Sequence, residues 1–377
     1  MAFNIDKITG REPLIDYPWR NEVDRLLSWL LDKDSHIQSF CFDIVMSAAY
    51  IDAASGLEKN IESCSASPND YNAHLGFINL CSPCYSRKNK WSHQKAIKPQ
   101  SGALGKLSSE VILRFIEKLY PELSEVIAVG GVEAADALLK HKNGMLILAE
   151  VKSAPLLTYP FLFKVKDSCI NGDHEKITIT GSQLRECESA IYLHNGEYIS
   201  LGKVGDNLWP FKPLVNFLTN PINEEFINTG IEQWLEARKA YSDKNRDNRM
   251  YYLANASGSP PKIAKERDAW PKSESISDSK TSAGMDRTDD IKKGIYQSLK
   301  IGTHIKSNPE YKTALISNLP AYRHGKEYVE PFIDMLWGLE DDLTDINGKR
   351  VITADNLRRV FDFIITLEEP ILRDMKL

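Results

Sequence analysis

Residues 130–155 read GGVEAADALLKHKNGMLILAEVKSAP, and they carry the strongest indication of the fold in the chain. Two mostly apolar runs, 135–141 and 145–152, have the length and composition of β-strands. The three residues between them end in Gly144. A three-residue hairpin loop needs its last residue at positive φ, which glycine adopts at little steric cost. The stretch therefore predicts a β-hairpin.

The register of this hairpin decides which acidic side chains meet. With a three-residue loop, Leu139 faces Ile147 and Asp136 faces Glu150. Directly opposed side chains share one face of a sheet, and Lys152 projects from the same face as Glu150. A two-residue Asn-Gly loop would shift the pairing by one residue and place Asp136 on the face opposite Glu150.

Two adjacent carboxylates repel each other at neutral pH unless a cation or a proton lies between them. Mg²⁺ resolves this repulsion, because it prefers one or two carboxylates together with waters and phosphate oxygens. An adjacent lysine can orient or help to deprotonate an attacking water, and it can offset negative charge on the phosphorus centre. Asp136, Glu150 and Lys152 are thus suited to metal-dependent hydrolysis of a phosphodiester bond.

Asp136, followed after thirteen residues by Glu150-Val151-Lys152, resembles the active-site motif of the PD-(D/E)XK nuclease superfamily, particularly of type II restriction endonucleases. The resemblance covers roughly residues 105–166. One departure is Ala135, where the family often has proline before the first aspartate. The resemblance implies an α/β fold with the restriction-endonuclease-like αβββαβ core, a mixed central sheet flanked by helices.

The same resemblance implies a function and a set of roles. Asp136 and Glu150 would bind Mg²⁺, Lys152 would assist the attacking water, and Glu110, on a helix expected over residues 108–120, would be an auxiliary catalytic residue. The implied activity is Mg²⁺-dependent cleavage of double-stranded DNA at a short specific sequence. The resemblance also implies a homodimer, and a gene for a cognate DNA methyltransferase next to the gene for this protein. A repair or structure-specific nuclease of the same fold, and a non-catalytic DNA-binding protein, are the alternatives. Glu133 is either a further ligand or a solvated charge.

Four regions follow from the pattern along the chain. We expect a helical N-terminal region with a possible zinc-binding segment (1–104) and a nuclease core with insertions (105–240). A flexible linker or long loop (241–288) and a C-terminal α/β part (289–377) follow. The C-terminal part completes the core if its helix and strand join the sheet.

Two pairs of elements compete to complete the core. One pair is a helix over 289–301 and a strand over 313–319, which would make residues 168–285 a large insertion. The other is the shorter path through 182–188 and 190–194.

A second constellation surrounds Cys81-Ser-Pro-Cys84. Thiolates with this spacing can hold one edge of a tetrahedral zinc site, and Cys64 and His74 are candidates for the other edge. The segment also resembles the zinc-bearing end of HNH nucleases, although the histidine-rich catalytic part of that family is not evident upstream. A structural Zn²⁺ ion, HNH catalysis and reduced cysteines without metal are the three interpretations.

Basic residues concentrate between Cys84 and Lys118, where eight lysines and arginines accompany two acidic residues. This local excess of positive charge is opposite in sign to the net charge of −5 of the whole chain, and it is suited to binding a phosphate backbone. A solvent-exposed face with no partner would have the same composition. The predicted DNA-binding residues are Arg87, Lys88 and Lys90 here, together with Lys292 and Lys293 on the later helix.

The composition places the chain among folded proteins of a reducing compartment. Hydrophobic residues make up 42% of the 377, enough for a sizeable core. No apolar run reaches the ~18–20 residues that a membrane span needs, and the first residues do not read as a signal peptide. Six cysteines are too few for a disulfide framework. We therefore expect a cytoplasmic protein with no membrane partner.

Overall fold

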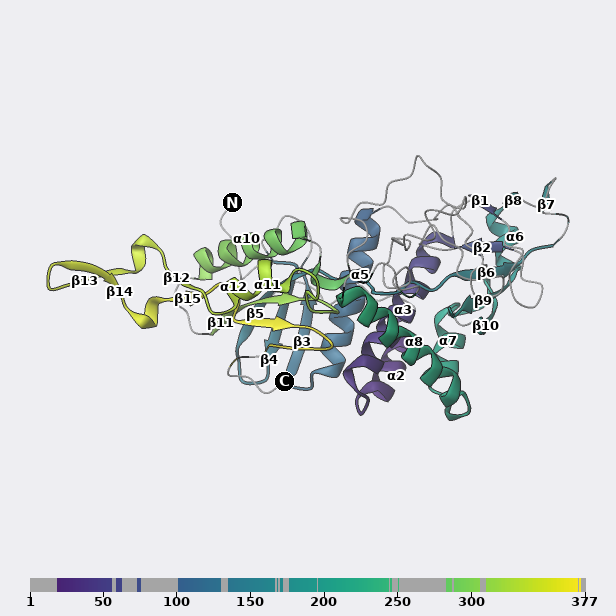
Figure 1. Ribbon diagram of the computed structural model, residues 1–377, viewed down its shortest axis with the longest axis horizontal. Coiled ribbons are helices and arrows are strands. Elements are labelled where there is room, and N and C mark those ends of the chain that lie inside the picture. Colours follow the sequence, from purple (N-terminus) through teal and green to yellow (C-terminus); the bar gives the residue numbers. More distant parts are fainter. Residues whose placement is uncertain are drawn as a thin grey trace. The chain divides into compact units, whose positions relative to one another are not determined.

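A computed structural model gives the architecture of the chain (Figure 1). The residues that the structure describes are 19–55, 59–62, 73–75, 101–129, 135–166, 168, 170–171, 176–194, 196–243, 245, 250, 283–286, 288–305, 310–371 and 373. They form two compact units. The first unit holds Ile112–Ser153 and Gly284–Leu377, and the second holds the described parts of Asp16–Val111 and Ala154–Ala283.

A five-stranded mixed sheet is the centre of the first unit, in the order β16-β11-β5-β4-β3. Antiparallel pairing joins β3 to β4 and β4 to β5, whereas β11 runs parallel to both β5 and β16. The expected α/β class with a mixed central sheet is confirmed. The strands are β3 (Leu123–Ala128), β4 (Ala137–His141), β5 (Leu146–Val151), β11 (Tyr311–Ile316) and β16 (Phe363–Ile365).

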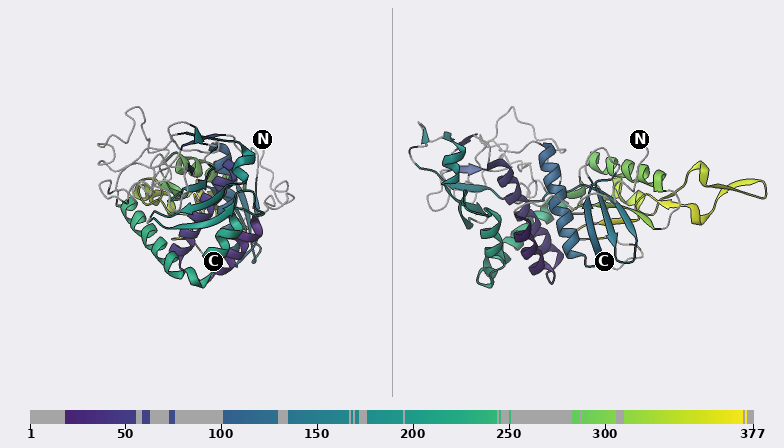
Figure 2. Two further views of the ribbon diagram at one scale, coloured as in Figure 1. Left: turned by 90° about the vertical axis from the view of Figure 1, so that its right-hand side faces the viewer. Right: turned by 180° about the vertical axis from the view of Figure 1, so that it is seen from behind.

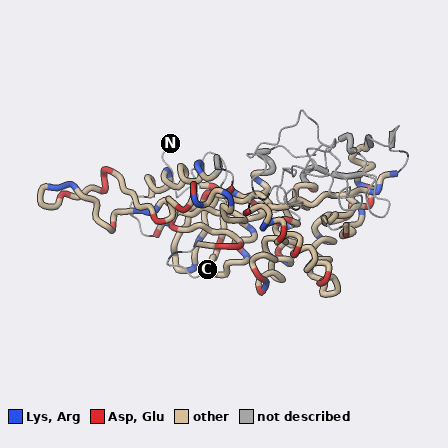
Figure 3. The backbone as a smooth tube through the Cα atoms, in the orientation of Figure 1, with Lys and Arg blue, Asp and Glu red and all other residues tan. Residues whose placement is uncertain are grey.

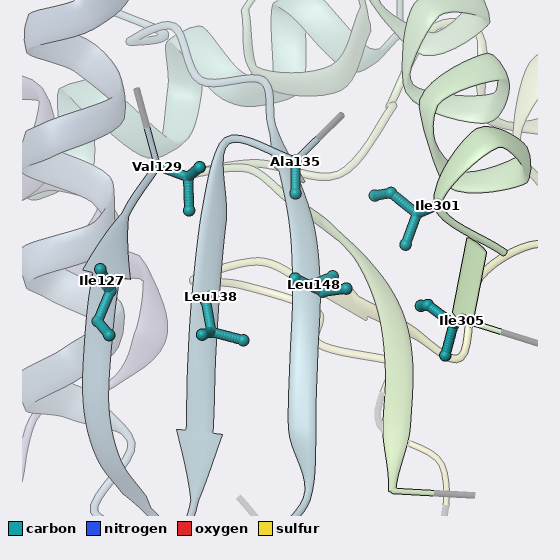
Figure 4. Packing of buried hydrophobic residues seen from close by; sticks show 7 residues of the cluster. All are labelled: Ile127, Val129, Ala135, Leu138, Leu148, Ile301 and Ile305. Carbon is teal, nitrogen blue, oxygen red and sulfur yellow. The ribbon is translucent and has the colours of Figure 1, made fainter. Parts of the chain in front are cut away.

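Helix α10 (Thr288–Ile305) covers one face of this sheet and lies in the chain between β5 and β11. Ile301 and Ile305 pack with Leu138 of β4 and Leu148 of β5 in one buried cluster (Figure 4). Such a face arises because apolar residues three and four positions apart fall on the same side of a helix. The cluster is Ile127, Val129, Ala135, Leu138, Leu148, Ile301 and Ile305.

Helix α5 (Ser101–Leu119) passes from the second unit into the first. Phe115 and Ile116, on the part that belongs to the first unit, are completely buried. The hydroxyl of Tyr120, directly after the helix, donates a hydrogen bond of 2.8 Å to the carbonyl oxygen of Thr366. This bond ties the end of α5 to the segment that follows β16.

The C-terminal part of the first unit, for which an α/β arrangement was expected, contains short helices and short strands after β11. It includes two small two-stranded antiparallel sheets, β12–β15 and β13–β14. The elements are α11 (Gly325–Tyr328), α12 (Glu330–Ile333), β12 (Leu336–Trp337), η6 (Glu340–Asp342), β13 (Leu343–Ile346), β14 (Lys349–Ile352), η7 (Ala354–Asn356) and β15 (Arg358–Arg359).

The second unit combines helices with two further sheets, ordered β10-β9-β6-β2 and β1-β8-β7 (Figure 2). Its helices are α2 (Arg20–Leu30), α3 (Ser35–Ser55), α6 (Gly181–Arg185), α7 (Phe211–Leu218), η2 (Pro221–Asn223) and α8 (Glu224–Ser242). Its strands are β1 (Lys59–Glu62), β2 (Ala73–Leu75), β6 (Phe161–Lys164), β7 (Ile170–Asn171), β8 (Lys176–Ile179), β9 (Glu188–Tyr192) and β10 (Tyr198–Lys203).

A completely buried carboxylate organises the second unit. Asp43 of α3 accepts hydrogen bonds from the backbone N–H of Leu156 (3.2 Å), from that of Leu157 (2.8 Å) and from the indole Nε1 of Trp234 in α8 (2.8 Å). Ser47, one turn further along α3, accepts a hydrogen bond of 2.9 Å from the N–H of Tyr159. These bonds hold the chain that leaves β5 against α3 and α8.

The observed division of the chain differs from the predicted regions. The expected core, 105–240, is shared between the units, because residues 154–240 belong to the second one. The expected linker, 241–288, extends too far at both ends: α8 ends at Ser242, and Gly284–Asp286 forms a buried 3₁₀ turn (η5). Residues 251–282 lie outside the described residues.

Within the part of the chain that the structure describes, no helix is both long and apolar enough to span a membrane.

Candidate active site

The β4–β5 hairpin is built as its loop predicts. Gly144 has a φ of 94°, and its N–H donates to the carbonyl oxygen of His141 (2.9 Å). The N–H of His141 donates to Met145 O (2.9 Å), which closes the three-residue loop. Leu139 therefore pairs with Ile147, so the three-residue register is confirmed and the two-residue alternative is excluded.

The backbone ladder between β4 and β5 stops at Ala137 and does not include the preceding residue, Asp136. The last pair is Ala137 with Ala149, and the N–H of Asp136 donates to Ala149 O (2.9 Å) instead of pairing with Glu150. The side chain of Asp136 then takes the place of a backbone acceptor, because the N–H of Val151 donates to its Oδ2 at 2.9 Å. One carboxylate oxygen of Asp136 is thereby fixed beside the end of β5.

Lys152 contacts both acidic side chains. Its Nζ lies 2.5 Å from Glu150 Oε1 and 3.7 Å from Asp136 Oδ2, and it also donates to the carbonyl oxygen of Val151 (3.2 Å). The backbone N–H of Lys152 donates to Ile316 O of β11 at 2.8 Å, so the parallel strand fixes the position of this residue. The structure thus brings Asp136, Glu150 and Lys152 into one cluster.

The three charged side chains differ in exposure. The Glu150 side chain is 6% exposed, that of Lys152 20% and that of Asp136 43%. Burial, and then the negative charge of Asp136, raise the pKa of Glu150 to about 7, against the opposing effect of Lys152. A carboxyl group with such a raised pKa is one that a bound cation would convert to the charged form.

Helix α10 lies over the same face of the sheet as Glu150. Glu150 lies two residues after Leu148 on β5, so the two side chains share a face of the sheet, and Leu148 packs against α10. The partner of Glu150 in β11 is Leu315, and a Cβ added to Gly294 of α10 would lie 3.0 Å from Leu315 Cδ1. This close approach of α10 to β11 explains in part why Glu150 is nearly inaccessible to water.

Two residues that the sequence did not indicate also lie beside the site: Ser153 after β5 and Asn318 after β11. Asn318, which is buried, lies with its Oδ1 3.2 Å from the hydroxyl of Ser153, the residue after Lys152. No motif identified them, because only the parallel pairing of β5 with β11 places residues 153 and 318 together.

The donor set is compatible with Mg²⁺. No group of three or more His, Cys, Asp or Glu side chains that could hold a metal ion is found among the described residues. Mg²⁺ does not need such a group, because it keeps several waters and binds through one or two carboxylates together with substrate phosphates. Asp136 and Glu150 supply two carboxylates of this kind, and Lys152 occupies the space between them.

The remaining predicted site residues lie on other elements or outside the described residues. Glu110 lies on the part of α5 that belongs to the second unit, where it is buried and approaches Lys106 at 3.8 Å. His74 lies in β2. The other predicted zinc ligands, Cys64, Cys81 and Cys84, fall outside the described residues. So do Glu133 and the predicted N-terminal DNA-binding residues, Arg87, Lys88 and Lys90.

Two of the predicted DNA-binding residues are described. Lys292 and Lys293 are both exposed on α10, and Lys292 Nζ lies 5.5 Å from the centre of the Tyr328 ring. Arg323 and His324, in the turn that precedes α11, are half-buried. Their backbone N–H groups donate to the buried carboxylate of Asp286 at 2.7 and 3.1 Å, so this turn is anchored to η5.

Comparisons with protein-family models, with curated proteins and with solved structures found no match to this chain.

Proposed function

We propose that this protein is a Mg²⁺-dependent endonuclease that hydrolyses phosphodiester bonds in double-stranded DNA at a short specific sequence, as type II restriction endonucleases do. One observation carries the proposal: Lys152 Nζ contacts Glu150 at 2.5 Å and Asp136 at 3.7 Å, at the end of a hairpin in a mixed sheet. Two carboxylates and a lysine in this arrangement fit metal-dependent phosphodiester hydrolysis.

The order of elements in the first unit supports the same proposal. The end of α5, strands β3, β4 and β5, helix α10 and strand β11 follow one another along the chain, apart from the residues of the second unit, and all four strands belong to one sheet. This is the αβββαβ order expected of a restriction-endonuclease-like core. In this proposal, the second unit is an insertion after Ser153 together with an N-terminal part.

The chain's own residues would divide the chemistry as follows. Asp136 and Glu150 hold the metal ion, which, when bound, polarises a phosphoryl oxygen and lowers the pKa of a coordinated water. Lys152 orients the attacking water and offsets the negative charge that develops on the phosphate. The hydrogen bond from Val151 N to Asp136 keeps this carboxylate aimed at the site. The auxiliary role of Glu110 stays a prediction.

The test is incubation of the purified full-length protein with a long unmethylated double-stranded DNA and Mg²⁺, followed by sequencing of the fragment ends. We expect discrete fragments whose ends share one short sequence, and no fragments when EDTA is present. A smear, or cleavage only of branched or damaged DNA, would favour a repair or structure-specific nuclease. Binding without cleavage under any divalent metal would favour a DNA-binding protein and contradict the enzymatic proposal.

A further inference from the structure

Strands β13 and β14, joined by Asn347 and Gly348, form an arm that leaves the body of the first unit (Figure 1). The pairing is antiparallel, with Asp345 opposite Arg350 and Ile346 opposite Lys349. Both turn residues have positive φ, 55° and 74°, as a two-residue type I′ turn requires. The arm is thus a regular two-stranded ribbon.

No residue near the end of the arm is covered by the rest of the chain that the structure describes. Every residue from 344 to 351 is exposed, and these include the apolar side chains of Ile346 (47%) and Val351 (36%). A two-stranded hairpin that buries neither face is at best marginally stable by itself in water. Its surfaces are therefore suited to contact with another molecule.

The base of the arm, in contrast, is firmly held. The guanidinium of Arg358 makes two bonds to the carboxylate of Asp342, at 2.6 and 2.9 Å, and both side chains are nearly buried. The Arg358 guanidinium also lies 5.6 Å from the centre of the Trp337 ring. That ring packs against α10 so closely that a Cβ on Gly302 would lie 2.5 Å from it. The arm is therefore connected rigidly to the helix that lies over Glu150.

We propose that this arm enters the major groove of DNA and reads base edges there. The proposal rests on the proposed nuclease function and identifies the element that would confer its sequence preference. The major groove admits a two-stranded β-ribbon, and a strand of four residues, at about 3.4 Å each, spans more than the groove depth of about 8.5 Å. The dimensions of β13 and β14 fit this requirement.

The side chains at the end of the arm have the chemistry of base recognition. Lys349 and Arg350 can donate to the guanine edge, Asn347 can pair with adenine, and Ile346 can contact the methyl group of thymine. Between 344 and 351 there are two basic residues and one acidic residue, whereas Glu340, Asp341 and Asp342 lie at the base of the arm. Figure 3 shows the basic residues at the far end of the hairpin, where a DNA phosphate backbone would be met first.

The experiment compares full-length variants in selection from a randomised double-stranded DNA pool. Ca²⁺ replaces Mg²⁺ in this selection, because Ca²⁺ is also a hard cation that takes oxygen ligands, and the readout is binding without cleavage. One variant replaces residues 344–351 by Asn-Gly, which retains the Leu343–Ile352 pair and a two-residue turn. A second is Arg350→Ala. The matched control is Lys326→Ala, which removes another exposed positive charge, on α11.

We expect the parent and Lys326→Ala to enrich the same motif and the shortened variant to enrich none. Arg350→Ala should lose preference at one or two positions, with about 5- to 150-fold weaker binding to the parental motif. Circular dichroism and thermal unfolding check that the variants are folded. Enrichment of the parental motif by the shortened variant would overturn the inference. A dimer that becomes a monomer when the arm is shortened, without change in the motif, would also overturn it and assign the arm to a second copy.

The outcomes separate this inference from the nuclease proposal. If the parent selects a motif through the arm but Mg²⁺ produces no cleavage, the inference stands and the proposed enzymatic function fails. If the parent cleaves at one sequence and the shortened variant still selects that sequence, the nuclease stands and the inference fails.

Discussion

Asp136 and Glu150 approach each other at the point where their two strands separate. The ladder ends at Ala137 and Ala149, and the N–H of Val151 is bound by the Asp136 carboxylate at 2.9 Å instead of by a backbone carbonyl. This exchange leaves the two acidic side chains together without a backbone pair between them, and Lys152 contacts both. The electrostatic repulsion between them contributes to the raised pKa of Glu150.

Asp136→Ala and Glu150→Ala should each abolish DNA cleavage, because each removes a proposed metal ligand. DNA binding without Mg²⁺ should persist, since less negative charge then faces the phosphates. The measurement is the initial rate of cleavage in Mg²⁺ together with a binding titration in EDTA. The matched control is Glu125→Ala, which removes a half-exposed carboxylate from β3 of the same sheet. Cleavage at a near-parental rate by either site variant would contradict the assignment.

Lys152→Ala should lower the cleavage rate by about 10²- to 10⁴-fold, the range for a positioned group that assists proton transfer. The affinity for DNA should change much less, because a single ammonium group that is only 20% exposed offers little to the phosphate backbone. Single-turnover rates at saturating enzyme measure the chemical step. Lys140→Ala, on the neighbouring strand and paired with Glu125 at 2.7 Å, is the control. An unchanged rate for Lys152→Ala would leave this lysine with a structural role.

The joint replacement of Lys292 and Lys293 by alanine should weaken DNA binding and its salt dependence. Both side chains are exposed on α10, and each phosphate contact contributes a slope of about −0.9 to the logarithm of the binding constant against the logarithm of salt concentration. The slope should therefore become less steep by up to about 2. The preferred sequence should stay the same, because phosphate contacts do not read bases. A parental slope would remove α10 from the DNA-binding surface.

Asp43→Ala should strongly destabilise the second unit, by about 3 kcal/mol or more. The substitution leaves two backbone N–H groups and the Trp234 indole buried without their acceptor, and each unsatisfied donor costs about 1–3 kcal/mol. Trp234→Phe removes only one of the three bonds and should cost less from this source. Urea denaturation measures both. Equal stability of the parent and Asp43→Ala would show that Asp43 does not organise the segment after β5.

His194 should make the second unit sensitive to acid. Its ring is buried beside Tyr159, and burial lowers the pKa of His194 from 6.5 to about 3. The folded state therefore favours the neutral ring. Above pH 6.5 the ring is neutral in the unfolded state as well, so His194 does not lower the free energy of unfolding there. Below that pH, stability falls by about 1.4 kcal/mol per pH unit until the pH approaches 3. Against the parent, His194→Gln should show a flatter decline between pH 6 and pH 4, and an identical pH profile would contradict the assignment.

The hairpin, and the charged side chains that meet at its end, were predictable from the amino-acid sequence. Gly144 specified a three-residue loop, because glycine tolerates the positive φ there, and that loop specified the register which brings Asp136 close to Glu150. The strand-length apolar run before Glu150 identified a buried strand, as β5 is. These features were readable because loop geometry and side-chain alternation depend only on residues near one another in the chain.

The elements from distant parts of the chain that surround this site could be identified only from the three-dimensional fold. Two helix–strand pairs fitted the sequence equally, and only the parallel pairing of Leu315 with Glu150 selects α10 and β11, which places Asn318 next to Ser153. The alternative pair, α6 and β9, belongs to the second unit. Parallel pairing over such a separation depends on side chains packing across the sheet, and neither the propensity nor the spacing of nearby residues encodes that packing.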